Sequence, residues 1–307
     1  MTPAAVQVGV SVHDSLMMAG AQRRRDLTGL IEQAGLDYLS LGDHVSFHDG
    51  TGFDGLIAAT AALSASDRLP VLVGVYLLGL RHPLLAARQL ASISQLAPGR
   101  LILGAGAGGE DRNEISNSGV DPATRGRRLD ECLQVLRALA GGSVVDHQGE
   151  FFELKAASIR PAPDPPVPIV VGGKGEAAVR RTVRYGDGWL GIFCSARRFA
   201  QTREQITAAA EAAGRAAPGW YGISIWCGLD ADAARARQLL AGRLEGLYRI
   251  PFGKFEHLAP AGTPDQVASQ LAPYLAAGVT HMSLIPAAAS AQAGVELAAA
   301  VRARLTG

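Results

Sequence analysis

The sequence predicts an α/β fold, a (β/α)8 TIM barrel built as one domain over residues 1–307. Apolar, strand-like runs alternate with stretches of helical spacing along the whole chain, which is typical of a parallel sheet. About eight such units fit into 307 residues, which favours a closed barrel over an open doubly wound sheet. Hairpin-like patterns are confined to residues 143–168, so we expect an insertion there, between the fourth helix and the fifth strand.

The expected strands are short, apolar runs of the kind that lie buried in parallel sheets. They cover residues 6–12, 36–44, 69–76, 99–104, 169–171, 188–193, 220–229 and 279–285. The expected helices carry apolar residues three and four positions apart. They cover residues 21–35, 53–64, 83–96, 122–139, 176–185, 197–213, 231–247, 263–277 and 294–305.

Several of these helices have recognisable ends. Pro83 stands in the first turn of its helix, where a missing N–H leaves no hydrogen bond unmade. Thr263 is an expected N-cap, and Pro264 follows it at the first helical position. Gly35 and Gly278 come directly after the last helical residues and predict where those helices stop.

Composition predicts a globular protein and limits the classes of partner that we expect for it. With 48% hydrophobic and 19% charged residues, the chain can bury a large core. The net charge of +1 gives no basic excess, so we expect no nucleic-acid partner. The widely spaced Cys132, Cys194 and Cys227 show no disulfide or metal-ligand pattern, which fits a cytoplasmic location. Residues 1–12 lack a signal-peptide pattern, and no apolar run is long enough for a membrane span.

Polar residues gather at the expected carboxyl ends of the strands, where ligands bind in parallel barrels. Asp43 and His44 end the second strand, and an adjacent acid can orient an imidazole and raise its basicity. Both are therefore catalytic candidates. Glu110, after the fourth strand, is a further acid–base candidate, and Glu114 stands close to it. The alternative for each of these residues is a place in a solvated, charged loop.

Two glycine-rich segments differ in what they indicate. Gly172–Gly175 closes a strand just before a helix whose first N–H groups lack helical partners, a geometry that binds phosphate, and Lys174 adds a positive charge. An ordinary tight turn remains the alternative. Gly104-x-Gly106-x-x-Gly109 matches the dinucleotide fingerprint as a string, but charged residues follow where an apolar helix should begin. We therefore assign no dinucleotide site.

Other side chains give weaker signals. His48 and Asp49, just after the Asp-His pair, lack the spacing of metal ligands, so no metal is predicted. Cys194 is expected to be a small apolar filler. His82 is expected to cap the helix that begins after it.

Together, several stretches resemble the luciferase-like monooxygenase superfamily of flavin- and deazaflavin-dependent (β/α)8 enzymes. They occur in the family's order and cover nearly the whole chain. They are residues 42–44, 82–89, 99–106, 125–131, 168–173, 186–189 and 262–264. Residues 109–114, Gly-Glu-Asp-Arg-Asn-Glu, resemble the Gly-Glu-x-x-Asn-Glu pattern of the sugar-phosphate dehydrogenases that use coenzyme F420, which favours that branch.

The resemblance implies coenzyme F420, or alternatively FMN, at the barrel mouth. In those dehydrogenases, the residues matching His44 and Glu110 act near the hydride-transfer centre. The family's third strand carries a bulge with a cis peptide, matching Gly74–Val75, that backs the cofactor ring. Glycines matching Gly172 and Gly173 hold the cofactor phosphate. The expected cofactor-binding residues are Asp43, His44, Gly74, Val75, Tyr76, Gly106, Gly108, Asn113, Gly172, Gly173 and Lys174.

The sequence thus predicts an F420-dependent oxidoreductase that transfers a hydride between the deazaflavin C5 and a small organic substrate. The alternative is an FMN-dependent monooxygenase that uses reduced flavin and O2, and a third reading is a non-catalytic flavin-binding protein. The related sugar-phosphate dehydrogenases carry a Trp where this chain has His48, which leaves the substrate open. Family members are commonly dimers, so we expect a homodimer.

Overall fold

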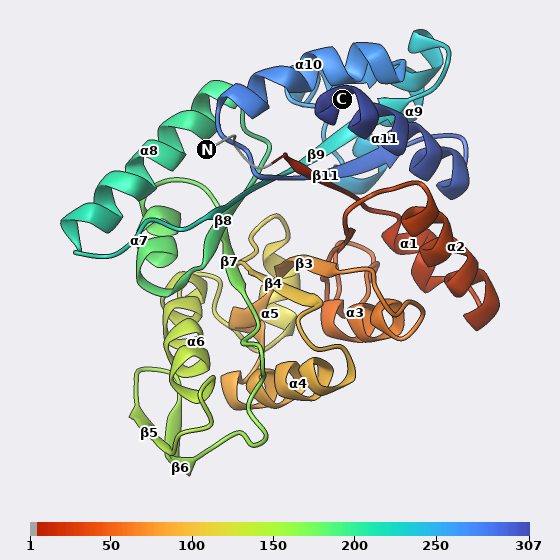
Figure 1. Ribbon diagram of the computed structural model, residues 1–307. Helices are drawn as coiled ribbons and strands as arrows, with labels where there is room; N and C mark the ends of the chain where they lie inside the picture. The colour runs from red at the N-terminus through yellow and green to blue at the C-terminus, as the bar shows by residue number, and fades with distance from the viewer. Residues whose placement is uncertain (1–4) are drawn as a thin grey trace. The chain divides into compact units, whose positions relative to one another are not determined.

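The computed structural model describes residues 5–307, which form two compact units. The first unit is Met1–Ser40 together with Trp189–Gly307, and the second is Leu41–Gly188. Figure 1 shows the alternation of strands and helices along the chain. Within residues 5–307, no helix is both long and apolar enough to cross a membrane.

The first unit has a parallel sheet in which β1 lies between β2 and β11, and β9 lies between β11 and the short β10. Its strands are β1 (Gln7–Val10), β2 (Leu39–Leu41), β8 (Gly188–Ile192), β9 (Trp220–Leu229), β10 (Ala261–Gly262) and β11 (His281–Ala287). Its helices are α1 (His13–Met17), α2 (Ala21–Gln33), α8 (Ala196–Ala212), α9 (Ala233–Tyr248), η2 (Phe252–Lys254), α10 (Pro264–Ala276) and α11 (Ala291–Thr306). Strands β2 and β8 each reach the boundary between the units.

Local chemistry explains where these helices begin and end. Thr263 accepts a hydrogen bond from the N–H of Gln266, and the Gln266 side chain accepts one from the N–H of Thr263, which closes a capping box at the start of α10. Pro264 takes the first helical position, as predicted. Gly35 follows the end of α2 with φ at 75°, a left-handed conformation that glycine adopts without steric cost.

The second unit contains the parallel strands β3, β4 and β7, with β4 in the middle. Its strands are β3 (Val71–Tyr76), β4 (Leu101–Ala105), β5 (Val145–Gln148), β6 (Glu153–Ala157) and β7 (Ile169–Gly172). Its helices are α3 (Gly55–Leu63), η1 (Leu78–Leu80), α4 (Pro83–Leu96), α5 (Arg112–Asn117), α6 (Arg125–Leu139) and α7 (Glu176–Tyr185). Helices α4 and α7 have the predicted bounds.

The predicted insertion is present as an antiparallel hairpin, β5–β6, next to α6 (Figure 1). Glu131 of α6 is buried and accepts hydrogen bonds from the N–H groups of Phe151 and Phe152, and it pairs with Nε2 of His147 at 2.9 Å. The Arg128 guanidinium lies 4.4 Å from the centre of the Phe152 ring. A buried carboxylate therefore fastens the hairpin to the helix before it.

The element order confirms the predicted fold class, an α/β (β/α)8 TIM barrel with an insertion between its fourth barrel helix, α6, and its fifth barrel strand, β7. A single domain over residues 1–307 stays a prediction, and residues 1–4 lie outside the described part of the chain. Two short helices differ from the expectation. None of the predicted helices covers residues 13–17 or 112–117, where the structure has α1 and α5.

Candidate functional site

All the predicted site residues belong to the second unit, and Asp43 anchors their arrangement. Its carboxylate accepts hydrogen bonds from the N–H of Gly55, at the start of α3, and from the N–H of Leu77, just after β3. Arg81 binds the same carboxylate with both terminal nitrogens, each at 2.7 Å. Burial raises the pKa of Asp43, and the bound guanidinium and the two N–H groups oppose that rise.

The expectation that Asp43 orients His44 is wrong. Both oxygens of Asp43 are taken up by Arg81 and backbone N–H groups, and its side chain has no exposed surface. Arg81 is 38 residues away in the chain, and its guanidinium neutralises the buried Asp43 carboxylate because folding brings the two side chains together. Asp43 therefore holds the ends of β2 and β3 together.

Glu114 of α5 is the partner of His44. Nδ1 of His44 lies 3.2 Å from each oxygen of the Glu114 carboxylate. The N–H groups of Val45 and Ser46 donate to the same carboxylate at 2.7 and 3.1 Å. Burial alone would raise the pKa of Glu114, but these hydrogen bonds outweigh it and hold the pKa below its usual range. The carboxylate is thus ionised at neutral pH.

Helix α5 positions Glu114 and begins at Asp111. The Asp111 side chain accepts a hydrogen bond from the N–H of Asn113, which makes it the N-cap. Its other oxygen accepts the N–H of His48 at 2.7 Å, and this bond lowers the pKa of Asp111 against the effect of burial. Asp and Glu three positions apart are a recognised helix-start pattern. That pattern was the overlooked signal for this helix.

The loop after β2 packs three rings in sequence. The centre of the Phe47 ring lies 4.3 Å from that of His44 and 4.1 Å from that of His48. Nδ1 of His48 lies 3.7 Å from the Asp111 carboxylate. Two carboxylates from the start of α5 thus face two imidazoles from one loop, with a buried phenyl ring between them in the sequence.

The predicted cis peptide is present between Gly74 and Val75, where the register of β3 against β4 shifts. Both residues are half-buried, although the strand before them is fully buried. A Cβ atom at Gly106 would collide with the Val75 side chain, and one at Gly172 would lie 2.5 Å from it. The two glycines therefore make room for Val75, so the ends of β3, β4 and β7 close around one small side chain.

The loop between β7 and α7 is exposed at Gly173 and Lys174. Gly173 has φ at 126°, which strongly favours glycine. Helix α7 begins after Gly175 and has no side-chain cap, so its first N–H groups are open to a ligand. A phosphate site at this turn stays a prediction.

The remaining predicted residues are less closely engaged. Glu110 is exposed and makes no hydrogen bond or ion pair within residues 5–307. Asn113 is exposed on α5, and Gly108 is half-buried in the loop before it. The Tyr76 side chain is buried with the Arg81 guanidinium 4.3 Å from its ring centre, so its ring is covered by the protein itself.

Other features of the described residues lie outside this arrangement. Within residues 5–307, no group of three His, Cys, Asp or Glu side chains could hold a metal ion. His82 caps α4 by accepting the N–H of Leu84, as expected, and Cys194 is buried.

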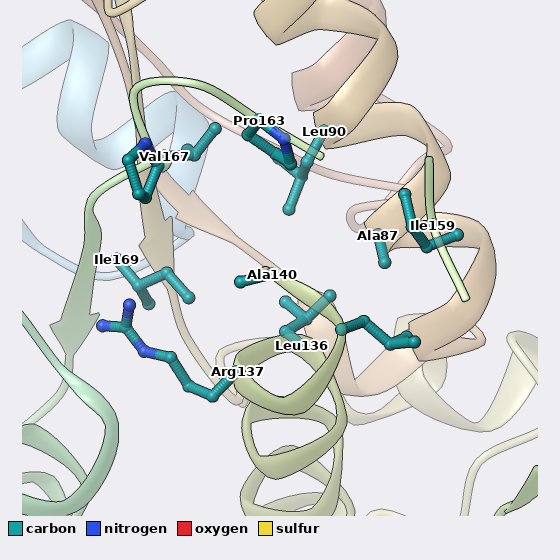
Figure 2. Close-up of a pocket in the computed structure, with 11 residues that line it drawn as sticks. Ala87, Leu90, Leu136, Arg137, Ala140, Ile159, Pro163, Val167 and Ile169 are labelled. Carbon is teal, nitrogen blue, oxygen red and sulfur yellow. The ribbon is translucent and has the colours of Figure 1, made fainter. Parts of the chain in front are cut away.

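An apolar pocket lies between α4, α6 and the segment before β7 (Figure 2). It includes Ile169, at the amino end of β7, whereas the candidate site is at the carboxyl ends of the strands.

Comparison with known proteins adds the family. The family model of luciferase-like monooxygenases matches residues 4–281. The chain belongs to this family. An F420-dependent glucose-6-phosphate dehydrogenase of Beutenbergia cavernae is 35% identical over 175 residues, which are 54% of this chain and 52% of that protein. The chain spans about half the length of the first curated relatives that it matches.

Several solved structures share the fold of this chain. An F420-dependent secondary alcohol dehydrogenase in complex with an F420–acetone adduct matches with a TM-score of 0.83 and 20% identity, over 97% of this chain and 99% of that chain. A type II Baeyer–Villiger monooxygenase from Pseudomonas putida, in complex with FMN, matches with a TM-score of 0.75 and 18% identity, over 98% of each chain. At these identities the likeness shows the fold alone.

Proposed function

We propose that this protein is an F420-dependent oxidoreductase that acts on a small organic substrate, with the cofactor at the carboxyl ends of the strands of the second unit. One observation carries the proposal. Asp43 ties the end of β2 to the residue after β3, so the His44 imidazole and the half-exposed Gly74–Val75 bulge stand at the same end of the molecule's parallel strands. Curated relatives named as F420-dependent enzymes support this cofactor class.

The residues present fit such a cofactor. The bulge at Gly74–Val75, with glycines at 106 and 172 around it, offers a surface without large side chains for a flat ring system. The open N-terminus of α7, behind Gly173 and Lys174, is suited to an anionic group. When bound, the deazaflavin supplies a two-electron hydride donor or acceptor at C5.

The chain's own residues handle the proton that accompanies the hydride. His44 carries an imidazole that is 35% exposed at the strand end, and an imidazole in such a place can serve as a general acid or base. Glu110 stays a second candidate for this role, since its carboxylate is exposed in the loop after β4. Asp43 stabilises the backbone around the site, and its buried side chain is not available to a ligand.

A panel of reactions tests the proposal. Oxidised F420 with alcohols, and reduced F420 with enones and imines, are followed by the absorbance of the deazaflavin with and without oxygen. We expect substrate-dependent turnover that consumes no O2. The FMN alternative predicts O2 uptake coupled to product formation with reduced FMN. That result, with no turnover in any F420 reaction, contradicts the proposal. A homodimer and a cytoplasmic location stay predictions.

A further inference from the structure

Glu114 holds His44 in a geometry that selects one protonation form of the imidazole. Its carboxylate oxygens both lie 3.2 Å from Nδ1, and the group is 4% exposed. An ionised carboxylate accepts hydrogen bonds and cannot donate them. Nδ1 must therefore carry the proton for this contact to be a hydrogen bond, and a neutral imidazole then has its lone pair on Nε2.

Several contacts fix the ring in this position. The N–H of His44 donates to the carbonyl oxygen of Phe53, which holds the backbone. A Cβ atom at Gly52 would lie 2.5 Å from the Cβ of His44, so the facing loop passes closely by the side chain. The Phe47 ring packs against the imidazole. Within residues 5–307, Nε2 has no hydrogen-bond partner, and the ring is 35% exposed.

We propose that Glu114 is a positioning residue that holds His44 as the Nδ1–H tautomer, which leaves Nε2 as the atom that exchanges a proton with the bound substrate. The catalytic part of this inference rests on the function proposed above. The tautomer itself does not, because it follows from the contacts of the chain alone. In the oxidation of an alcohol, Nε2 takes the hydroxyl proton and becomes an imidazolium N–H; in the reverse direction it returns that proton.

The competing explanation is that Glu114 merely fastens the loop by binding the N–H groups of Val45 and Ser46. Glu114→Gln separates the two roles. The amide oxygen of Gln can still accept from the loop N–H groups. Its NH2 group then faces Nδ1 and donates to it, which drives the imidazole to the Nε2–H tautomer. A loop fastener predicts no such inversion.

Long-range proton–nitrogen NMR spectra of the protein with labelled histidine measure the tautomer of His44 directly. The spectra are taken where the ring nitrogen shifts themselves show the neutral imidazole, and a His44→Gln variant assigns the signal. We expect a protonated Nδ1 and a pyridine-type Nε2 in the native protein, and the reverse in Glu114→Gln. Glu131→Gln is the matched control, because Glu131 also binds one imidazole and two backbone N–H groups. It should leave the His44 signals unchanged.

A native protein with His44 as the Nε2–H tautomer would overturn the inference, and this needs no variant. So would a folded Glu114→Gln protein whose tautomer stays as in the native protein. Turnover gives an independent readout. In Glu114→Gln, kcat should fall about tenfold to a hundredfold, as when the partner of an oriented histidine is lost, with KM nearly unchanged. If no F420 reaction is found, the proposed function fails while the tautomer result still stands.

Discussion

Two parts of the second unit each hold a histidine through a buried glutamate, but they expose the imidazole to different extents. Glu114 on α5 binds Nδ1 of His44 and two consecutive backbone N–H groups. Glu131 on α6 binds Nε2 of His147 and, likewise, two consecutive backbone N–H groups. The His44 side chain is 35% exposed, whereas that of His147 is 11% exposed.

The difference in exposure shows that a carboxylate–histidine pair does not by itself indicate a catalytic role. The Glu131 pair joins α6 to β5 of the insertion hairpin, and its hydrogen bonds are those expected of a structural link between helix and hairpin. The Glu114 pair lies at the end of β2, tied through Asp43 to Leu77, two residues after the Gly74–Val75 bulge. Exposure and place in the fold make only the second pair available to a ligand.

The largest expected contrast is in turnover. His44→Ala should lower kcat for the F420 reaction by about 10²–10⁴-fold, because a positioned general acid–base contributes that much. His147→Ala should keep kcat within a few-fold, since His147 lies in β5 of the hairpin with its side chain only 11% exposed. Steady-state kinetics of both purified proteins measure the contrast. Full turnover in His44→Ala, with the cofactor still bound, would remove the catalytic role of this residue.

A smaller effect is expected on stability. Glu114→Gln and Glu131→Gln should each lower the free energy of unfolding by about 1–3 kcal/mol at neutral pH, because each weakens a buried set of three hydrogen bonds. Equilibrium denaturation in urea measures both values. An unchanged stability in both variants would show that these carboxylates are not needed to hold the structure.

The pH dependence of the Glu114 variant sharpens this test. The pKa of Glu114 is lowered in the folded protein from its ordinary value of 4.5. Its stabilising contribution is therefore complete above that value and is lost as the pH falls through the lower, folded pKa. The stability gap between the native protein and Glu114→Gln should shrink in acid. A gap that widens in acid would contradict the assigned ionisation.

The smallest expected effect is local. Glu131→Ala removes the acceptor for the N–H groups of Phe151 and Phe152, so their hydrogen exchange should become about tenfold faster, which corresponds to about 1.4 kcal/mol. The amides of Val45 and Ser46 should exchange as in the native protein. Exchange measured by NMR or mass spectrometry compares the two loops. Equal acceleration in both would mean that the two anchors are not independent.

Much of the fold was predictable because local signals agreed with the tertiary structure. Pro83 and the apolar spacing after it gave the bounds of α4, and the glycine-rich turn before Glu176 marked the start of α7. Helix α5 was missed because its residues are polar and give no apolar periodicity. The spacing of Asp111 and Glu114 was the only local signal, and it competed with the appearance of a charged loop.

The positions of the candidate residues in the fold were easier to predict than their contacts. His44, Gly74–Val75 and the turn at Gly172–Gly173 stand at the expected strand ends. The partner of His44 could not be read from its neighbour in sequence, because Glu114 is 70 residues away and Asp43 turns to Arg81. Which carboxylate meets which cation depends on how strands and helices pack, and no local pattern encodes it.

A paired titration of the cofactor-free protein with coenzyme F420 and with FMN, followed by ligand fluorescence, tests the central claim most directly. The account predicts that F420 binds at least about tenfold more tightly than FMN, a difference of about 1.4 kcal/mol. Tighter binding of FMN would contradict the assignment to the deazaflavin branch. Binding of neither would contradict a cofactor site at the ends of β3 and β7.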